Sequence, residues 1–295
     1  MGTEALFRVD LSAANALAIA VCVVPAVASC TRADVRGERA ALARGATTET
    51  HLAALDGIGD AMGPMLPVPA GAFAMGSLDG DEDERPVHVV SVAAFTIGAT
   101  EVTARAYGAC VAAAACPPAG EGPYCNGAVP GRADHPINCV SWSDAKAFCA
   151  WVGGRLPTEA QWEYAARGPS ARTYPWGDAP PRAQLCWDGP GSELGLGKRR
   201  GTCPVGRYPE GRGPFGALDM AGNVWEWTAD AYSEDYGAEA LTASATAAAG
   251  ARALRVVRGG TWFGYDAEDV RAALRFRVRP DARNYGIGFR CVRDH

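Results

Sequence analysis

The second half of the chain combines many glycines, prolines and aromatic residues with almost no hydrophobic periodicity. Examples are the segments Tyr174-Pro-Trp-Gly-Asp178 and Arg207-Tyr-Pro-Glu-Gly211. Because glycine and proline interrupt helices and strands, such a composition predicts turns and loops rather than long regular elements. All eight tryptophans lie between Trp142 and Trp262, so we expect the main core of a loop-dominated fold in that region.

Two helices are predicted between His135 and Gly168. Ser141 is followed three residues later by Asp144, and Thr158 is followed three residues later by Gln161. Each pair places side-chain acceptors where the first N–H groups of a helix need them. A glycine pair and a proline lie between the two patterns, and they end the first helix before the second begins.

Strands and turns are predicted ahead of this helical pair. The segments Ala70–Gly76 and Val87–Val92 carry strand-forming residues, and the acidic run Asp79–Glu84 between them predicts a turn. A cation is one interpretation of that acidic run, and a solvated turn is the one we favour. Ala104–Ala115 is expected to form a further helix.

The charge balance argues against a nucleic-acid partner. The net charge is -5, and the one compact basic run is Lys198-Arg199-Arg200. Because a phosphate backbone is bound by clustered lysines and arginines, a run this short is better interpreted as a solvated loop.

The N-terminal residues have the pattern of an export signal. Leu11–Ser29 is apolar, short and interrupted by Pro25, and it ends in Val27-Ala28-Ser29-Cys30, which resembles a bacterial lipobox. We expect residues 1–30 to be a signal with lipid attached at Cys30, 31–64 to be a flexible tether, and 65–295 to form the domain. A plain cleaved signal and a cytoplasmic or membrane-retained N-terminus are the alternatives. The favoured reading predicts a lipoprotein of the bacterial cell envelope that contacts the membrane only through its anchor.

Ten cysteines fit an oxidising compartment. Two belong to the export segment, and an even eight remain, which favours disulfides. A metal site made of cysteine and histidine is disfavoured, because the chain has no CxxC pair and only four histidines. Cys186 and Cys203 flank one loop and are expected to pair. Three connectivities remain open for the other N-terminal group, which is Cys110, Cys116, Cys125 and Cys139.

Four blocks resemble, in order, the signatures of the formylglycine-generating-enzyme (sulfatase-modifying factor) family. They are His135–Gly168, Pro204–Trp227, Arg255–Trp262 and Gly286–Val292. Shorter matches at Val68–Ser77 and Glu101–Thr103 extend the resemblance over about residues 65 to 295. The resemblance implies an α+β, loop-rich fold of the C-type-lectin-like kind, and a disulfide between Cys149 and Cys291.

The chain departs from this family where the chemistry occurs. Family enzymes carry a cysteine pair that binds copper(I) and oxidises a substrate cysteine with oxygen, and the matching positions here hold Gly264 and Asp269. Copper(I) requires soft thiolate ligands, which glycine and a hard carboxylate do not supply. Copper is therefore not expected, no catalytic residue is assigned, and formylglycine generation is not expected.

Three classes of function follow from the resemblance and this departure. We favour a pseudoenzyme, an exported and lipid-anchored binding or scaffold module of the cell envelope. The alternative is an oxidoreductase of the formylglycine-generating and sulfoxide-synthase superfamily with altered chemistry. A sulfatase activator with displaced cysteines is the third.

A ligand groove is expected where the family binds its substrate. Aromatic and paired polar groups in a cleft suit a peptide, protein or glycan ligand. The competing interpretation is that the arginines and acids only pair with one another within a loop-rich domain. The candidate groove residues are Trp262, Tyr265, Asp266, Asp269, Arg271, Arg275, Arg277 and Asn284.

A structural calcium ion is the one cofactor that the resemblance implies. The corresponding family block binds calcium through two side chains and two backbone carbonyls, which map here onto Asp219, Gly222, Val224 and Glu226. Calcium prefers hard oxygen ligands in a flexible shell, and this turn-rich segment supplies them. The alternative is that the two carboxylates hold the loop by accepting backbone N–H groups without an ion.

Overall fold

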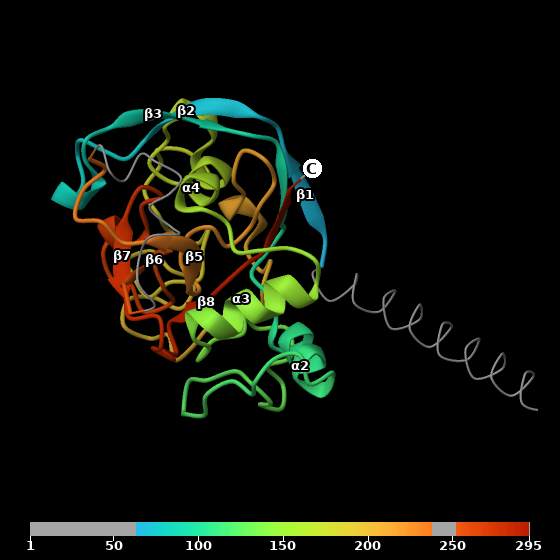
Figure 1. Cartoon of the computed structure of the whole chain (residues 1–295). Coiled ribbons are helices and arrows are strands. Elements are labelled where there is room, and N and C mark those ends of the chain that lie inside the picture. Colours follow the sequence, from blue (N-terminus) through green and yellow to red (C-terminus); the bar gives the residue numbers. More distant parts are fainter. Residues whose placement is uncertain (1–62, 238–251, 295) are drawn as a thin grey trace, which may run out of the picture. The chain divides into compact units, whose positions relative to one another are not determined.

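Three short helices and three small sheets surround the core of the part of the chain that the structure describes, residues 63–237 and 252–294 (Figure 1). The structure is a computed structural model, and these residues belong to a compact unit from Leu52 to His295. The expected export signal, the lipidation site Cys30 and all but the last two residues of the tether 31–64 lie outside the described residues.

The helices begin where the capping patterns predict. In α3 (Trp142–Trp151), Ser141 Oγ accepts from Asp144 N and the Asp144 carboxylate accepts from Ser141 N. Thr158 and Gln161 exchange the same two bonds at the start of α4 (Glu159–Arg167). The expected helix from Ala104 is α2 (Ala104–Ala112), which ends three residues early. No helix within residues 63–237 and 252–294 is long and apolar enough to cross a membrane.

The strands pair across large sequence distances. β1 (Met65–Val68), β4 (Phe95–Gly98) and β9 (Val292–Asp294) form one antiparallel sheet, so both ends of the domain meet in it. β2 (Gly71–Met75) and β3 (His88–Val92) form the hairpin that the early pattern predicts. A four-stranded sheet has the order β7-β6-β5-β8, made of Arg275–Val278, Arg255–Arg258, Trp225–Ala231 and Ile287–Gly288.

The expectation of a loop-dominated second half is confirmed. Between α4 and β5 the backbone holds only two 3-10 turns, η2 (Gly168–Ser170) and η3 (Pro209–Gly211). Two further 3-10 turns, η1 (Glu82–Glu84) and η4 (Ala267–Val270), lie elsewhere in the described chain. The acidic run near residue 80 thus forms the predicted turn, but Glu84 at its end is buried and pairs with Arg271 instead of being solvated. The mixture of helices, sheets and long loops is the expected α+β class.

Two of the four apolar clusters in the described chain contain most of its buried apolar side chains. The first contains Phe148 of α3 and packs it against Trp227 and Phe289. The second contains Trp162 of α4 and packs it with Phe73 and other residues of the N-terminal strands. Each of the two predicted helices therefore supplies its apolar side to a different cluster.

Four disulfides link the eight cysteines of the domain. The expected bonds Cys149–Cys291 and Cys186–Cys203 are both present. The open connectivity of the N-terminal four resolves into two local bonds, Cys110–Cys116 and Cys125–Cys139. Cys149–Cys291 joins α3 to the residue before β9 across 142 residues, and it lies in the first apolar cluster.

Removing this long-range bond should cost much more stability than removing a local one. In the chain-entropy model, the double substitution Cys149→Ala/Cys291→Ala lowers the free energy of unfolding by about 5 kcal/mol, because the unfolded chain is freed from a long loop. The matched control Cys110→Ala/Cys116→Ala opens a loop of six residues and should cost about 2 kcal/mol. Denaturant unfolding measures both, and equal losses would contradict the loop-length argument.

Candidate functional site

The two positions of the family's cysteine pair lie side by side. Gly264 precedes the turn η4 and Asp269 lies within it. A Cβ atom on Gly264 would lie 3.2 Å from the Cβ atom of Asp269. Disulfide-bonded cysteines hold their Cβ atoms about 3.5–4.5 Å apart, so the two positions are adjacent but a few tenths of an ångström too close, and the backbone would have to shift slightly to hold two cysteines.

Asp269 has a structural role at this place. Its Oδ2 atom accepts hydrogen bonds from the backbone N–H groups of Tyr265 and Asp266, at 3.0 and 3.1 Å. The carboxylate therefore satisfies donors at the start of η4, as a helix cap does. The carbonyl of Gly264 accepts from Asp188 N at 3.2 Å, which joins this loop to the segment that follows Cys186.

Two of the candidate groove arginines are buried in ion pairs. Arg271 donates to both oxygens of Glu84 at 2.7 and 2.8 Å and also pairs with Glu268. Arg275 donates to both oxygens of Glu159 at 2.7 and 3.2 Å. The structure thus supports the competing interpretation for these two side chains, which is that they pair within the domain.

Arg275 and Arg277 also line an open pocket of about 860 Å³. Tyr232 forms one wall, donates to Asp83 and accepts from Arg277, whose guanidinium lies over its ring. The remaining lining residues are mainly acidic: Asp81, Glu82, Glu234 and Asp235, with Arg85, Pro86 and Phe276. The pocket is lined by residues from both halves of the domain, and no other candidate groove residue lines it.

Trp262 lies in a different place, within an aromatic cluster. Its ring is 5.0–6.1 Å from the rings of Tyr124, Phe263 and Tyr285, and its indole N–H is buried without a hydrogen-bond partner. Asn284 adjoins Tyr285 and holds the backbone there by accepting from Gly286 N. The eight candidate residues are therefore divided among an aromatic cluster, the η4 turn with Tyr265, Asp266 and Asp269, and the buried or pocket-lining arginines.

The residues mapped to calcium lie in a buried group of carboxylates. Both oxygens of Glu226 accept from Arg290 at 2.7 Å, and one also accepts from the indole N–H of Trp162. Asp219 accepts from Gly206 N at 2.6 Å. Glu101 lies beside them with neither carboxylate oxygen hydrogen-bonded. Burial, with the neighbouring charges of Asp219 and Glu226, holds the pKa of Glu101 well above its ordinary value.

These residues fit a calcium ion in part. Three carboxylates face one arginine, so a bound calcium ion would offset the excess negative charge. It would also be coordinated by the Glu101 oxygens, which accept no hydrogen bond. Glu226 is already engaged by Arg290 and would have to share its oxygens. No group of three acidic, histidine or cysteine side chains in residues 63–237 and 252–294 is arranged as a metal site. Backbone carbonyls such as those of Gly222 and Val224 would therefore have to complete the shell.

The sequence matches a known family model over residues 59–295, that of the sulfatase-modifying factor enzyme 1-like domain. The chain belongs to this family. It is 35% identical to the formylglycine-generating enzyme of Streptomyces coelicolor, in a match that covers 77% of this chain and 88% of that protein. It is 33% identical to the Bos taurus enzyme, with coverages of 78% and 75%. A second Bos taurus relative, described as inactive formylglycine-generating enzyme 2, is 38% identical over 172 residues, with coverages of 55% and 51%.

The solved structures agree with the family assignment. The structure of PvdO from Pseudomonas aeruginosa superposes with a TM-score of 0.65 at 30% identity, covering 78% of this chain and 94% of PvdO. The expected loop-rich fold of the sulfatase-modifying factor type is thereby confirmed. In this family member the cysteine pair of the enzymes is replaced by Gly264 and Asp269, which retain the paired backbone positions.

One member of the carboxylate group was missed at the sequence level. Glu101 belongs to the short block Glu101-Val-Thr103 that matches the family, but nothing in the local pattern shows that it approaches Asp219 and Glu226. Thr103 caps α2, and that role accounts for only part of the block. The sequence carries one sign of this role: Glu101 is acidic, lies just before the cap residue Thr103, and its side chain takes no part in the cap.

A pH dependence of stability is expected from Asp230, which lies on β5 and accepts from Glu159 N at the start of α4. Burial, with the charge of Glu159, raises the pKa of Asp230 to about 6. The folded state therefore favours the protonated form, and this contribution to stability is lost as the pH rises through about 6. Asp230→Asn should raise the free energy of unfolding at pH 8 by up to about 3 kcal/mol and have little effect near pH 4.

The matched control for this prediction is Asp281→Asn. Asp281 is exposed and pairs with Arg279, which lowers its pKa, so its substitution should not stabilise the protein at pH 8. Denaturant unfolding of both variants across this pH range provides the measurement. A stabilisation by Asp230→Asn that is independent of pH would contradict the assignment.

Proposed function

We propose that this family member is a binding or scaffold module that does not generate formylglycine. The observation that carries the proposal is the pair Gly264 and Asp269, because these adjacent positions, to which the resemblance assigns the cysteine pair, hold no thiolate. Copper(I) is bound by soft ligands, and a carboxylate that already caps a turn is a poor substitute. The existence of a relative described as inactive is consistent with such a role.

The proposed binding surface is the aromatic cluster of Tyr124, Trp262, Phe263 and Tyr285. Tyr285 is 41% exposed, so the cluster reaches the surface. Aromatic rings suit the apolar faces of a peptide or glycan. The ligand is proposed to come from a protein or glycan of the envelope.

The test compares the protein with a variant in which the pair is restored. After loading with copper(I) and gel filtration, the unmodified protein should retain no copper and leave the cysteine of a sulfatase-type peptide unchanged. Gly264→Cys/Asp269→Cys should bind copper, because the backbone already places both side chains together. Elemental analysis and peptide mass spectrometry measure these outcomes. Copper retention and cysteine conversion by the unmodified protein would overturn the proposal.

An oxidoreductase with altered chemistry is the second candidate, and it is favoured by the naming of the full-length relatives as enzymes. The pocket beside Arg275 and Arg277 would be its site, since it combines volume with charged side chains. A redox-active metal that remains bound through purification would favour this candidate over a binding module.

A structural calcium ion is also proposed, held by Asp219, Glu226 and the carbonyls of Gly222 and Val224, with Glu101 as an additional carboxylate. The excess of buried negative charge around Arg290 supports it. Chelation should lower the melting temperature, and added calcium should restore it. Asp219→Ala should abolish this response while Asp281→Ala, at an exposed position, should preserve it. A melting temperature insensitive to chelator, in protein shown to contain no calcium, would contradict the ion.

Export with lipid attachment at Cys30 is proposed for the whole chain. Four disulfides support an oxidising compartment, because cytosolic thiols are kept reduced. Mass spectrometry of protein from native membranes should find a lipidated Cys30 as the first residue. A mature chain that retains Met1 would contradict this proposal.

A further inference from the structure

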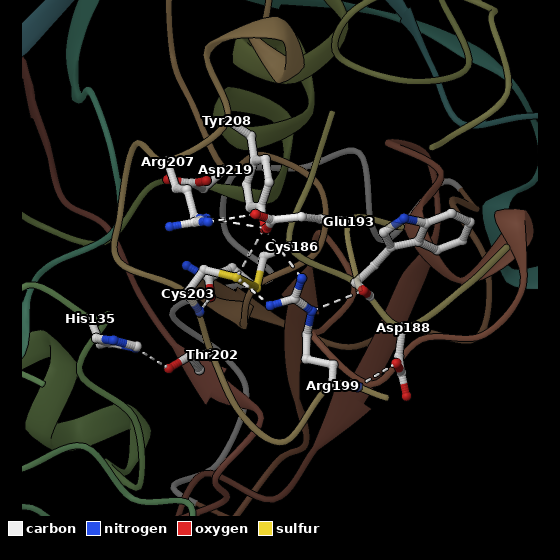
Figure 2. Close-up of a disulfide and its surroundings, with 12 residues drawn as sticks. His135, Cys186, Asp188, Glu193, Arg199, Thr202, Cys203, Arg207, Tyr208 and Asp219 are labelled. Atoms are coloured by element: carbon white, nitrogen blue, oxygen red, sulfur yellow. Dashed lines mark hydrogen bonds and ion pairs between the residues drawn. A yellow bond between two sulfur atoms is a disulfide. The ribbon is translucent and has the colours of Figure 1, made fainter. Parts of the chain in front are cut away.

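The disulfide Cys186–Cys203 is unlike a purely structural bond, because a charged side chain contacts it. Figure 2 shows the guanidinium of Arg199 beside the two sulfur atoms. Its Nη1 donates to the sulfur of Cys203 at 2.7 Å, and its Nη2 donates to the hydroxyl of Tyr208 at 3.2 Å. Its Nε donates to the carbonyl of Trp187 at 2.9 Å, which fixes the plane of the group.

Arg199 is buried without a direct anionic partner. Its exposed fraction is 6%. No carboxylate in the described chain lies within 4 Å of its guanidinium group. Glu193 is reached only through Tyr208, whose hydroxyl donates to it at 2.6 Å, and Glu193 is also paired with Arg207. A buried cation with no adjacent anion is unfavourable, and a negative charge on Cys203 would relieve that cost.

The other three disulfides lack this feature. Cys149–Cys291 lies among Phe148, Phe289 and other apolar side chains of the first cluster. Within residues 63–237 and 252–294, Cys203 is the one disulfide cysteine whose sulfur accepts a hydrogen bond from a charged group. An adjacent arginine lowers the pKa of a cysteine thiol and makes it a better leaving group in disulfide exchange.

We propose that Cys186–Cys203 is a redox-active disulfide, reduced in preference to the other three, with Cys203 as the thiolate that Arg199 stabilises. The reductant is a thiol. Its thiolate attacks the sulfur of Cys186, the bond between the two cysteines breaks, and the electron pair passes to Cys203. With a dithiol, the second thiolate then attacks the mixed disulfide, the dithiol leaves in its oxidised form, and Cys186 takes up a proton.

Reduction at this place would reach the proposed binding surface. Asn223 N donates to the carbonyl of Cys186, and Trp262 N donates to the carbonyl of Asn223. Cys203 N donates to the side chain of Asn223. The bond therefore supports the backbone beneath Trp262, and the two cysteines belong to the same apolar cluster as Trp262. The proposal itself does not depend on the function proposed for that cluster.

Thiol access requires local opening. Cys186 is fully buried and Cys203 is 3% exposed. The segment between them has no helix or strand, so opening it breaks few backbone hydrogen bonds of regular secondary structure. Exchange is expected to be slow, and the test is therefore an equilibrium measurement. The charged and titratable groups around the bond are Arg199, Tyr208, Glu193, Arg207, Asp188, Asp219 and His135, which is hydrogen-bonded to Thr202.

The experiment equilibrates the full oxidised chain in dithiothreitol buffers of graded redox potential and then alkylates the free thiols. Peptide mass spectrometry gives the reduced fraction of each pair. Cys186 and Cys203 should become reduced under the mildest conditions, ahead of the other six cysteines. If they are reduced together with or after Cys149 and Cys291, the proposal is overturned.

Substitution of Arg199 tests whether its positive charge causes the preferential reduction of Cys186–Cys203. In Arg199→Gln, the equilibrium constant for reducing this pair at pH 7 should fall about tenfold, because a thiol pKa about one unit below the pH favours reduction by about a factor of ten. Arg200→Gln is the matched control, because Arg200 is exposed and contacts only backbone carbonyls. Arg199→Lys keeps the charge and should retain the preference.

The pH dependence of the midpoint potential distinguishes two effects of Arg199: stabilisation of the Cys203 thiolate by its charge, and packing against the disulfide. If reduced Cys203 stays a thiolate at neutral pH, reduction takes up one proton rather than two, so the midpoint potential changes with pH half as steeply as in Arg199→Gln. The same slope in both proteins would overturn the role of Arg199. The order of reduction is measured on the unmodified chain alone, so this part of the test decides the proposal even if Arg199→Gln does not fold.

Discussion

The arrangement of the domain depends on one buried carboxylate, that of Glu163 on α4. Its oxygens accept from Arg167, from Arg258 on β6 and from the backbone N–H of Gly76 after β2. Three segments that are distant in sequence are joined at this point. A buried charge is stable only when it is paired and hydrogen-bonded, so each of these groups requires the others. Because loops dominate the fold, many segments are not held in place by a sheet or a helix. Buried ion pairs of this kind position those segments.

The same constraint explains why the candidate groove was only partly predictable. Arg271 and Arg275 were assigned to a ligand surface because arginines near aromatic residues suit a binding cleft. Their partners, Glu84 and Glu159, lie 187 and 116 residues away. Helix starts could be predicted because Ser141 and Thr158 act on residues three positions further along the chain. A pairing over more than a hundred residues leaves no such local pattern.

The family resemblance supplied what local patterns did not. It gave the bond Cys149–Cys291 and the block that contains Asp219 and Glu226, and the structure shows the bond. It also identified positions 264 and 269, and their proximity in space supports that alignment. The two positions are adjacent at the η4 turn, and the Asp269 carboxylate satisfies the N–H groups of Tyr265 and Asp266 there. The carboxylate therefore stabilises the turn at a position where the resemblance implies a thiolate.

The pairing of β9 with β4 has a consequence for the order in which the domain can form. Residues Val292–Asp294 complete the sheet that begins at Met65, and Cys291 beside them closes the bond to α3. A nascent chain therefore lacks one edge of its first sheet and one half of its longest covalent link until residues 291–294 have been made. The edge of β4 that β9 covers must remain unpaired while the intervening residues are made. Deleting residues 292–294 would remove the strand that β4 requires on that edge.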